Sequence, residues 1–117
     1  MELRKPIEVR LLEDAGEYFD SLDEKIQIKL LKSFDKTQMG LKGQWFKQLN
    51  RNIWELRERD HRSFYRILGF WDRTENKMTL ILATHGFDKK TNKTPPGQIA
   101  KAERMRTEYF KNKKSGK

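Results

Sequence analysis

The sequence contains no cysteine, which excludes disulfide bonds, thiolate metal sites and cysteine nucleophiles. It also lacks a long apolar run: the longest, from Leu80 to Ala83, is far shorter than the ~20 residues that span a bilayer. Near the amino terminus, Glu13, Asp14 and Glu17 stand where a signal peptide would need an apolar core. These absences lead us to expect a soluble, cytoplasmic protein without a membrane partner.

Sites for metals and for phosphate-bearing cofactors are equally scarce. The two histidines, His61 and His85, lie far apart in the chain, and no carboxylates cluster near His85. No glycine-rich phosphate loop is present in the sequence. We therefore expect no cofactor, and we expect His61 to be an exposed residue of a charged turn.

Positive charge is what the sequence has in excess. Its 117 residues, enough for one domain, include 26 Lys or Arg and 17 Asp or Glu, which gives a net charge of +9. Residues 1–40 hold seven basic and nine acidic residues, whereas residues 41–117 hold 19 and eight. Such asymmetry indicates a surface that faces a polyanion or an acidic protein, with the first forty residues as scaffold. Four lysines near the end can instead form a solvated tail: Lys111, Lys113, Lys114 and Lys117.

The spacing of apolar residues predicts a strand and two helices in the first forty residues. Residues 6–11 alternate as in a half-buried strand, and residues 12–21 have apolar positions at helical spacing. Ser21 and Glu24 resemble a capping box that opens a second helix, which ends near Met39. The two helices should form a hairpin.

After Gly43 the period changes to two and predicts an antiparallel meander. Its three strands cover residues 53–59, 63–71 and 77–85, separated by short turns. Thr94 can then cap a helix whose first turn tolerates two prolines. The order β-α-α-β-β-β-α predicts an α+β domain with helices packed on a small antiparallel sheet. We expect a single domain, 1–117, composed of a strand with a helical hairpin (1–40), a basic meander and loop (45–94), a carboxy-terminal helix (95–111) and a disordered tail (112–117).

Charged residues on the meander are candidates for a functional site. Glu55, Arg57 and Arg59 share one face of its first strand. On the next strand Arg66 lies among apolar residues, where burying an arginine is costly unless its guanidinium has a partner. An internal ion pair with Glu55 or Glu58 is one explanation of Arg66, and a functional role is the other.

The end of the last meander strand carries a second candidate. His85 precedes a stretch that contains Lys89, Lys90 and Lys93, so a phosphate bound there would lie beside a proton-transfer group. A hydrogen-bonded residue at a strand end is the simpler explanation of His85. The sequence alone leaves both open.

Three stretches of the chain carry a family resemblance. They are Trp54-Glu55-Leu56-Arg57, Tyr65-Arg66-Ile67 and Leu82-Ala83-Thr84-His85-Gly86-Phe87-Asp88-Lys89-Lys90-Thr91-Asn92-Lys93-Thr94-Pro95. Across residues 45–110 the sequence resembles the phage-derived, HigB-like branch of the RelE/ParE toxin superfamily, most specifically in the run from His85 to Pro95. The order of strands and helices predicted above agrees with the small fold of that superfamily.

The resemblance implies a toxin of a type II toxin–antitoxin pair. Such a toxin is a ribosome-dependent endoribonuclease, or mRNA interferase, which cleaves messenger RNA without a metal and so inhibits translation. Its basic side chains help the ribose 2′-hydroxyl to attack the neighbouring phosphate. The partners that the resemblance implies are the ribosome, messenger RNA and a cognate HigA-like antitoxin with a helix-turn-helix domain.

Matching positions give the candidate residues their expected roles. The expected catalytic residues are Arg57, Arg66, His85 and Lys90. Further contacts with RNA or phosphate are expected from Lys89, Lys93, Arg59 and Arg62, and Arg62 competes with Arg66 for the role of the strand arginine. Some ribonucleases of the superfamily have a lysine where this chain has Glu55. Glu55 is therefore either the general base or the partner that holds Arg57 in place.

Two alternative functions remain open at this point. One is a ParE-like inhibitor of DNA gyrase, which would not cleave RNA. The other is a non-catalytic basic module that binds RNA, in which Trp45, Trp54 and Trp71 would stack on bases. Core packing is the competing explanation for Trp54 and Trp71, because both lie on predicted strands.

Overall fold

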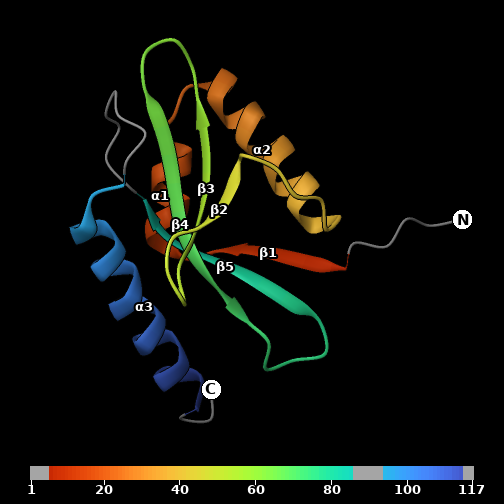
Figure 1. Cartoon of the computed structure of the whole chain (residues 1–117), viewed down its shortest axis with the longest axis vertical. Helices are drawn as coiled ribbons and strands as arrows, with labels where there is room; N and C mark the ends of the chain where they lie inside the picture. Colours follow the sequence, from red (N-terminus) through yellow and green to blue (C-terminus); the bar gives the residue numbers. More distant parts are fainter. Residues whose placement is uncertain (1–5, 86–93, 115–117) are drawn as a thin grey trace, which may run out of the picture.

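A computed structural model describes residues 6–85 and 94–114 of the chain (Figure 1). Within them the elements are β1 (Ile7–Leu11), α1 (Glu13–Asp20), α2 (Glu24–Gln38), β2 (Phe46–Gln48), β3 (Trp54–Arg59), β4 (Phe64–Asp72), β5 (Met78–His85) and α3 (Pro96–Lys114). The predicted first strand, helical hairpin, meander and carboxy-terminal helix are all present, and the α+β class is confirmed. The sequence does not reveal β2, because three residues are too few to show a period of two.

The strands form one sheet in the order β1-β5-β4-β3-β2. Neighbouring strands are antiparallel except β1, which runs parallel to β5. The sheet is therefore mixed, and it differs from the expected antiparallel sheet at this one edge. A parallel pairing is open to β1 because two helices and three strands separate it from β5 in sequence. The central position of β5 agrees with the apolar residues on both of its faces.

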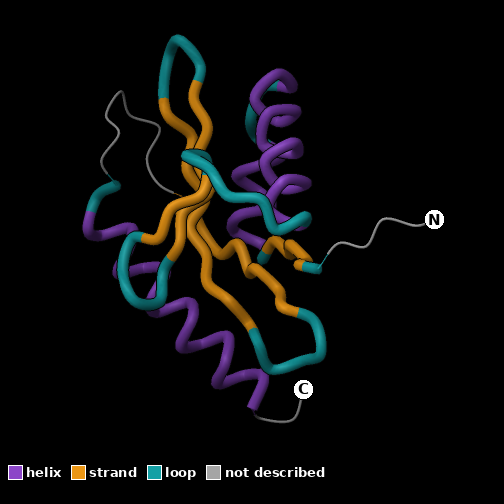
Figure 2. Tube along the Cα trace, turned by 45° about the vertical axis from the view of Figure 1, so that its right-hand side comes forward, coloured by secondary structure: helices purple, strands orange, loops and turns teal. Residues whose placement is uncertain are grey.

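The helices cover the two faces of the sheet (Figure 2). On one face, Tyr18 of α1 and Leu30 of α2 pack with Ile67 of β4 and with other alternate residues of the strands. On the other face α3 packs against β4 and β5 through one apolar stripe. The members of this stripe are Ile99, Ala102, Met105 and Tyr109. The site described below lies where the face covered by α1 and α2 meets the end of β3.

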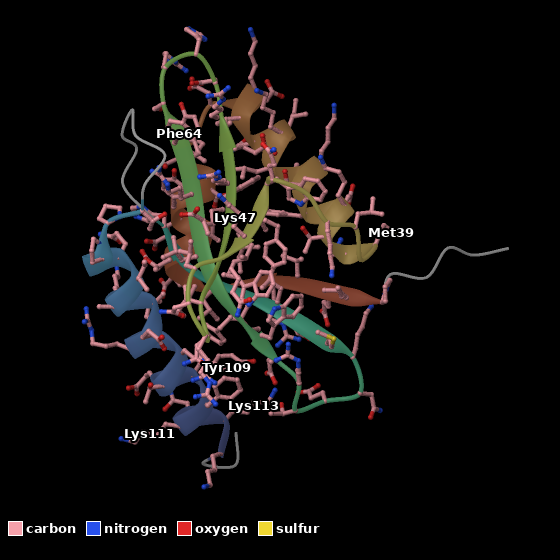
Figure 3. All side chains as sticks on the ribbon, in the orientation of Figure 1. Met39, Lys47, Phe64, Tyr109, Lys111 and Lys113 are labelled. Atoms are coloured by element: carbon pink, nitrogen blue, oxygen red, sulfur yellow. The ribbon has the colours of Figure 1, made fainter. Side chains whose placement is uncertain are left out.

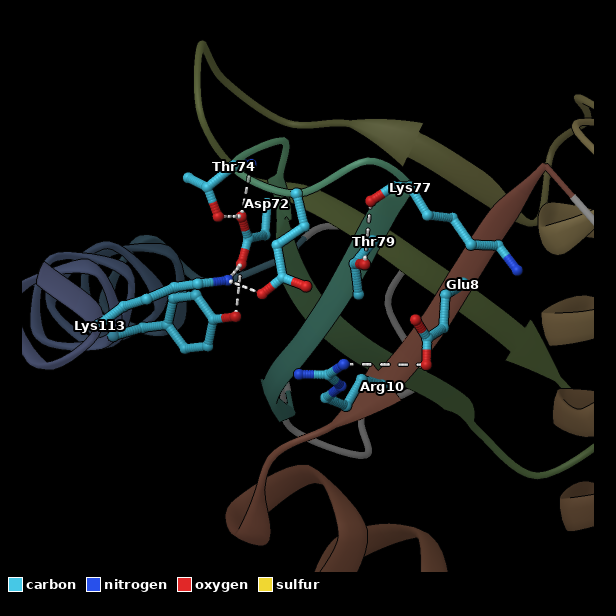
Figure 4. Close-up of polar contacts among 9 residues, drawn as sticks. Glu8, Arg10, Asp72, Thr74, Lys77, Thr79 and Lys113 are labelled. Atoms are coloured by element: carbon cyan, nitrogen blue, oxygen red, sulfur yellow. Dashed lines mark hydrogen bonds and ion pairs between the residues drawn. The ribbon is translucent and has the colours of Figure 1, made fainter. Parts of the chain in front are cut away.

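Bonds to the turn between β4 and β5 hold the last turn of α3 (Figure 4). The Lys113 Nζ atom lies 2.6 Å from a carboxylate oxygen of Asp72 and 2.9 Å from one of Glu75. The Tyr109 hydroxyl donates to Asp72 over 2.6 Å. With these bonds α3 continues to Lys114, beyond its predicted end at residue 111. Lys113 is thus a structural residue and not part of a solvated tail.

Two hydroxyls predicted to cap helices have other partners. Ser21 ends α1, because its hydroxyl donates to the Tyr18 carbonyl over 2.6 Å, and α2 begins after Asp23 without a side-chain cap. Thr94 lies before the start of α3, and its hydroxyl donates to the Glu55 carboxylate of β3. The capping predictions for Ser21 and Thr94 are wrong because the residue directly before α2 is Asp23 and the residue directly before α3 is Pro95, whose carbonyl accepts the N–H of Ile99.

A bulge interrupts the pairing of β4 with β5. Leu68 lies opposite Thr84, but Gly69 lies opposite Leu82, so Ala83 is an extra residue in β5. A Cβ atom on Gly69 would lie 2.2 Å from the Ile81 carbonyl oxygen, so this close approach requires glycine. Because one residue is added, the side chains of β5 that follow Ala83 exchange faces.

Helix α2 also bonds to the backbone of two strands. The side-chain oxygen of Gln38 accepts a hydrogen bond from the Val9 N–H of β1 over 3.2 Å. The Lys29 Nζ atom donates to the Arg59 carbonyl of β3 over 2.9 Å. β2 pairs with residues 54–56 of β3, and next to this pairing the Arg57 N–H donates to the Trp45 carbonyl. We call residues 57–59, which extend past β2, the open edge of β3.

Candidate nucleic-acid interface

An ion pair lies inside the domain between β3 and β4. The side chains of Arg66 and Glu55 are 0% and 1% exposed, and Arg66 Nε lies 3.5 Å from Glu55 Oε2. Thr94 is also buried, and its hydroxyl donates to the same carboxylate. Of the two explanations of Arg66, an internal ion pair or a functional role, the structure supplies the ion pair, and its acidic partner is Glu55.

The strand register gives the physical reason for this pair. Arg57 lies directly opposite Arg66, and like charges at opposed positions repel each other. Glu55 shares a face of β3 with Arg57 and supplies the compensating negative charge. Glu58, the other candidate partner, points to the opposite face, where the Ser33 hydroxyl of α2 donates to its carboxylate over 2.5 Å. Glu55 is thus enclosed between the sheet and the start of α3.

His85 lies apart from Arg66 because of the bulge. After the bulge His85 pairs with Ile67, whose side chain belongs to the core under α1 and α2. The imidazole stacks on the Tyr18 ring of α1, with the ring centres 4.2 Å apart and the planes nearly parallel. Without the extra residue His85 would share the face of Arg66 and Glu55. The structure does not bring His85 together with the arginines of the predicted site.

The carboxylate of Asp14 in α1 lies close to His85. Burial acts to raise the pKa of Asp14, but hydrogen bonds from Thr84 and Lys101 outweigh it and hold this pKa below its ordinary value. The charge of Lys101 and the nearby His85 act in the same direction. This cluster joins α1, β5 and α3 around the end of β5, which favours a structural position for His85.

A pocket of about 450 Å³ opens at the open edge of β3. It is lined by Lys36, Gln44, Trp45, Arg57, Glu58, Arg59 and Phe64. The walls come from α2, from the segment before β2, from β3 and from the start of β4, which Phe64 marks in Figure 3. Two residues of the predicted site, Arg57 and Arg59, therefore meet in one pocket.

Cations and aromatic rings alternate around this pocket. The Lys36 Nζ atom lies 4.0 Å from the centre of the Trp45 ring, and the Arg59 guanidinium carbon lies 5.8 Å from that of Phe64. The indole N–H of Trp45 donates to the Thr37 hydroxyl over 3.0 Å, which fixes the ring. Three cations and two aromatic rings thus line the same pocket. This combination suits a nucleotide, because phosphates pair with cations and bases stack on aromatic rings.

The sequence did not identify every residue of this pocket. Lys36 belongs to the first forty residues, which the distribution of charge assigns to the scaffold, but it lies next to the buried Thr37 of α2. The sequence pattern predicts no role for Phe64 beyond its place in a strand. Trp54 and Trp71 pack around Phe46, with ring centres 4.7 and 6.0 Å from it. Trp45 packs against the core beneath α2 and also lines the pocket. Packing therefore accounts for Trp54 and Trp71, and Trp45 has both a packing role and a place in the pocket.

Arg62 and His61 lie in the turn between β3 and β4, both exposed. Arg62 lies 2.7 Å from the carboxylate of Asp23 and 3.6 Å from that of Asp60, and the bond to Asp23 raises its pKa. The backbone N–H of Arg62 in turn lowers the pKa of Asp60 to about 2, with help from Ser63 and Tyr65. A second pocket, of about 550 Å³, lies between this turn and the start of α2. Arg62 thus borders a different pocket from Arg57 and Arg59, and the structure does not place it beside Arg66.

Three predicted site residues, Lys89, Lys90 and Lys93, lie outside the described residues, so their roles stay predictions. In the part that is described, no three His, Asp or Glu side chains gather as metal ligands would. No helix in that part is long and apolar enough to cross a membrane.

Comparison with known proteins gives one match. The family model described as "Phage derived protein Gp49-like (DUF891)" matches residues 17–107. Searches of curated proteins and of solved structures returned no match. The matched range begins in α1 and ends in α3, so it includes the sheet from β2 to β5 and all the residues that line the first pocket. The chain therefore belongs to the Gp49-like family of phage-derived proteins.

Proposed function

We propose that this protein is the toxin of a type II toxin–antitoxin pair and that it cleaves messenger RNA on the ribosome. The pocket at the open edge of β3 is the observation that supports this most, because Arg57 and Arg59 line it beside two aromatic rings. Membership of the Gp49-like family is consistent with a toxin-like module. The excess of basic residues after residue 40 provides the charge that RNA binding requires.

The proposed reaction is an attack of the ribose 2′-oxygen on the adjacent phosphorus. The new bond closes a 2′,3′-cyclic phosphate, and the bond from phosphorus to the 5′-oxygen breaks. Negative charge grows on the phosphate oxygens, where cations held in place beforehand stabilise it. The backbone that carries Arg57 is fixed, because its N–H donates to the Trp45 carbonyl over 2.7 Å while the strand pairs with β4.

A base must take the proton of the 2′-hydroxyl. Glu58 lines the pocket from the face of β3 that meets α2, where Ser33 donates to its carboxylate, whereas Glu55 is enclosed with Arg66 and Thr94. We therefore assign the general base to Glu58 and give Glu55 the role of holding the arginines. The leaving 5′-oxygen takes its proton from solvent.

The Arg57→Ala variant tests this function. We expect it to lose growth arrest on expression and to cut messenger RNA roughly a hundredfold to a thousandfold more slowly, since one preorganised cation is removed. Primer extension on total RNA after brief induction measures the cleavage and its phase in the reading frame. The matched control is Arg104→Ala, which removes an exposed arginine on α3.

Two results would contradict the proposal. One is full cleavage by Arg57→Ala while it folds like the wild type in thermal melts. The other is wild-type protein that arrests growth with translated messenger RNA intact. In the proposed system a HigA-like antitoxin neutralises the toxin, so co-expression of the neighbouring gene should restore growth.

A further inference from the structure

Four lysines of α2 lie on one stripe of the helix. They are Lys25, Lys29, Lys32 and Lys36, spaced by four, three and four residues. At 100° per residue these positions fall within about 60° of the helix circumference. The buried residues of α2, such as Leu30 and Phe34, lie on a different face. The stripe is therefore a separate basic surface within the first forty residues, which hold seven basic and nine acidic residues.

This stripe runs beside the open edge of β3. Lys29 donates to the Arg59 carbonyl, and Lys36 lines the first pocket together with Arg57 and Arg59. At the other end of the helix, Lys25 and Lys29 line the second pocket with Arg62, and the carboxylates of Asp23, Glu24 and Asp60 line it as well. Lys32 lies between these contacts on the same stripe, and it is exposed. The lysines thus border two pockets, one toward each end of α2, and we call the surface that includes both pockets the α2–β3 groove.

We propose that the α2–β3 groove is a track for single-stranded RNA, with one nucleotide in the first pocket and the adjoining phosphates along the lysines of α2. This inference rests on the proposed function, because it extends the RNA substrate beyond the pocket. The stripe is about 16 Å long at 1.5 Å per residue, which is the length of a few nucleotides.

The aromatic rings favour RNA over an acidic protein as the occupant. Trp45 and Phe64 lie in the same pocket as three cations, and stacking on such rings is available to every base. They also favour a single strand over a duplex, since the bases of a single strand are open to stacking by side chains. An acidic peptide would pair with the lysines but would have no use for the rings.

A binding experiment on the whole chain tests the track. The probe is a short fluorescent 2′-O-methyl RNA of mixed sequence, which cannot be cleaved by 2′-hydroxyl attack. The variant is Lys25→Gln with Lys32→Gln, and the control with the same loss of charge is Lys77→Gln with Arg104→Gln. All four residues are exposed, so neither pair of substitutions disturbs the core. Fluorescence anisotropy gives the dissociation constant across about 50 to 200 mM salt.

We expect the groove variant to bind on the order of tenfold more weakly at low salt, with a salt slope reduced by about 1.4, because two phosphate contacts are lost. The control should keep the wild-type slope. Equal changes in both proteins would overturn the proposal, since a general field of charge would then explain the binding.

Phe64→Leu and two competitors test the nature of the occupant. We expect Phe64→Leu to weaken binding of the single strand on the order of tenfold and to leave the salt slope unchanged. Duplex RNA and polyglutamate should compete poorly with the probe. Displacement of the probe by polyglutamate as effectively as by unlabelled single strand would identify an acidic protein as the occupant and reject RNA. A wild-type protein that binds this probe along the groove but cuts no messenger RNA would reject the nuclease and leave the track in place.

Discussion

The inside of the sheet and the open edge of β3 use the same kinds of charged residue in opposite ways. Inside, Arg66, Glu55 and Thr94 are buried and bound to one another. At the open edge, Arg57 and Arg59 line a pocket that is open to a ligand. Charges that are enclosed set the geometry of the strands, and charges at the open edge border a pocket. The difference depends on what covers each residue and not on residue type.

The largest expected effect comes from breaking the enclosed pair. Glu55→Gln leaves Arg66 buried without its carboxylate, and we expect a loss of about 3–5 kcal/mol in the free energy of unfolding. Arg59→Ala at the open edge should change it by less than about 0.5 kcal/mol, as for an exposed surface site. Urea denaturation of both variants measures the contrast.

A double variant shows whether the loss of stability in Glu55→Gln comes from the unpaired charge or from poorer packing. Glu55→Gln with Arg66→Met removes the buried charge altogether and should recover much of the stability, because apolar residues of similar volume can replace a buried pair. Equal stabilities of Glu55→Gln and Arg59→Ala would show that burial does not separate the two groups of charges.

A smaller effect is expected at the bulge that turns His85 away from Arg66. Gly69→Ala places a Cβ against the Ile81 carbonyl and should cost about 1–3 kcal/mol. Gly16→Ala is the matched control, since a Cβ there meets nothing within 4 Å and α1 should gain up to about 1 kcal/mol. Thermal unfolding measures both. A Gly69→Ala variant as stable as the wild type would mean that the close approach of β4 and β5 is not needed.

The smallest effect concerns how two carboxylates, Asp72 and Asp60, make the stability of the fold depend on pH. Burial acts to raise the pKa of Asp72, but bonds from Lys113, Thr74 and Tyr109 hold it well below the ordinary value of 3.8. Asp60, in the exposed turn, has its pKa lowered to about 2. The pKa of each carboxylate is lower in the folded state than in the unfolded chain. Each carboxylate therefore stabilises the folded state fully above the unfolded pKa of about 4, and this stabilisation is lost as the pH falls toward 2.

The two carboxylates should differ in how much each contributes to the pH dependence of stability. Asp72→Asn should flatten the fall in stability between pH 5 and about pH 2 more than Asp60→Asn, because solvent screens the exposed turn. Urea melts at a series of pH values give the two curves. A larger flattening for Asp60→Asn would place the stronger interaction at the exposed turn instead.

Local patterns in the sequence were enough for most of the fold. Alternation and helical spacing located the first strand, both helices of the hairpin, the meander and α3, since each of these buries a regular set of apolar residues. The bulge was not predictable, because it depends on how close Gly69 comes to another strand. The bond of Thr94 to Glu55 joins residues far apart in the chain, and no local pattern encodes it.

The candidate site was only partly visible in the sequence for the same reason. Arg57 and Arg59 alternate on a strand and could be named, and their meeting in one pocket agrees with that prediction. Lys36 comes from a segment with more acidic than basic residues, so a count of charge by segment concealed it. Helical spacing of the lysines was the signal that could have found it, because it shows which residues share a face.

The two backbone bonds of α2 also bear on how this chain behaves among its own copies. An outer strand with unused N–H and C=O groups invites another chain to add a strand and start an aggregate. Gln38 occupies the Val9 N–H of β1, and Lys29 occupies the Arg59 carbonyl of β3. One helix thereby blocks strand addition at two margins of the sheet, and a second chain would have to remove these side chains first. The lysine that helps to form the groove thus also protects a basic protein from joining to itself.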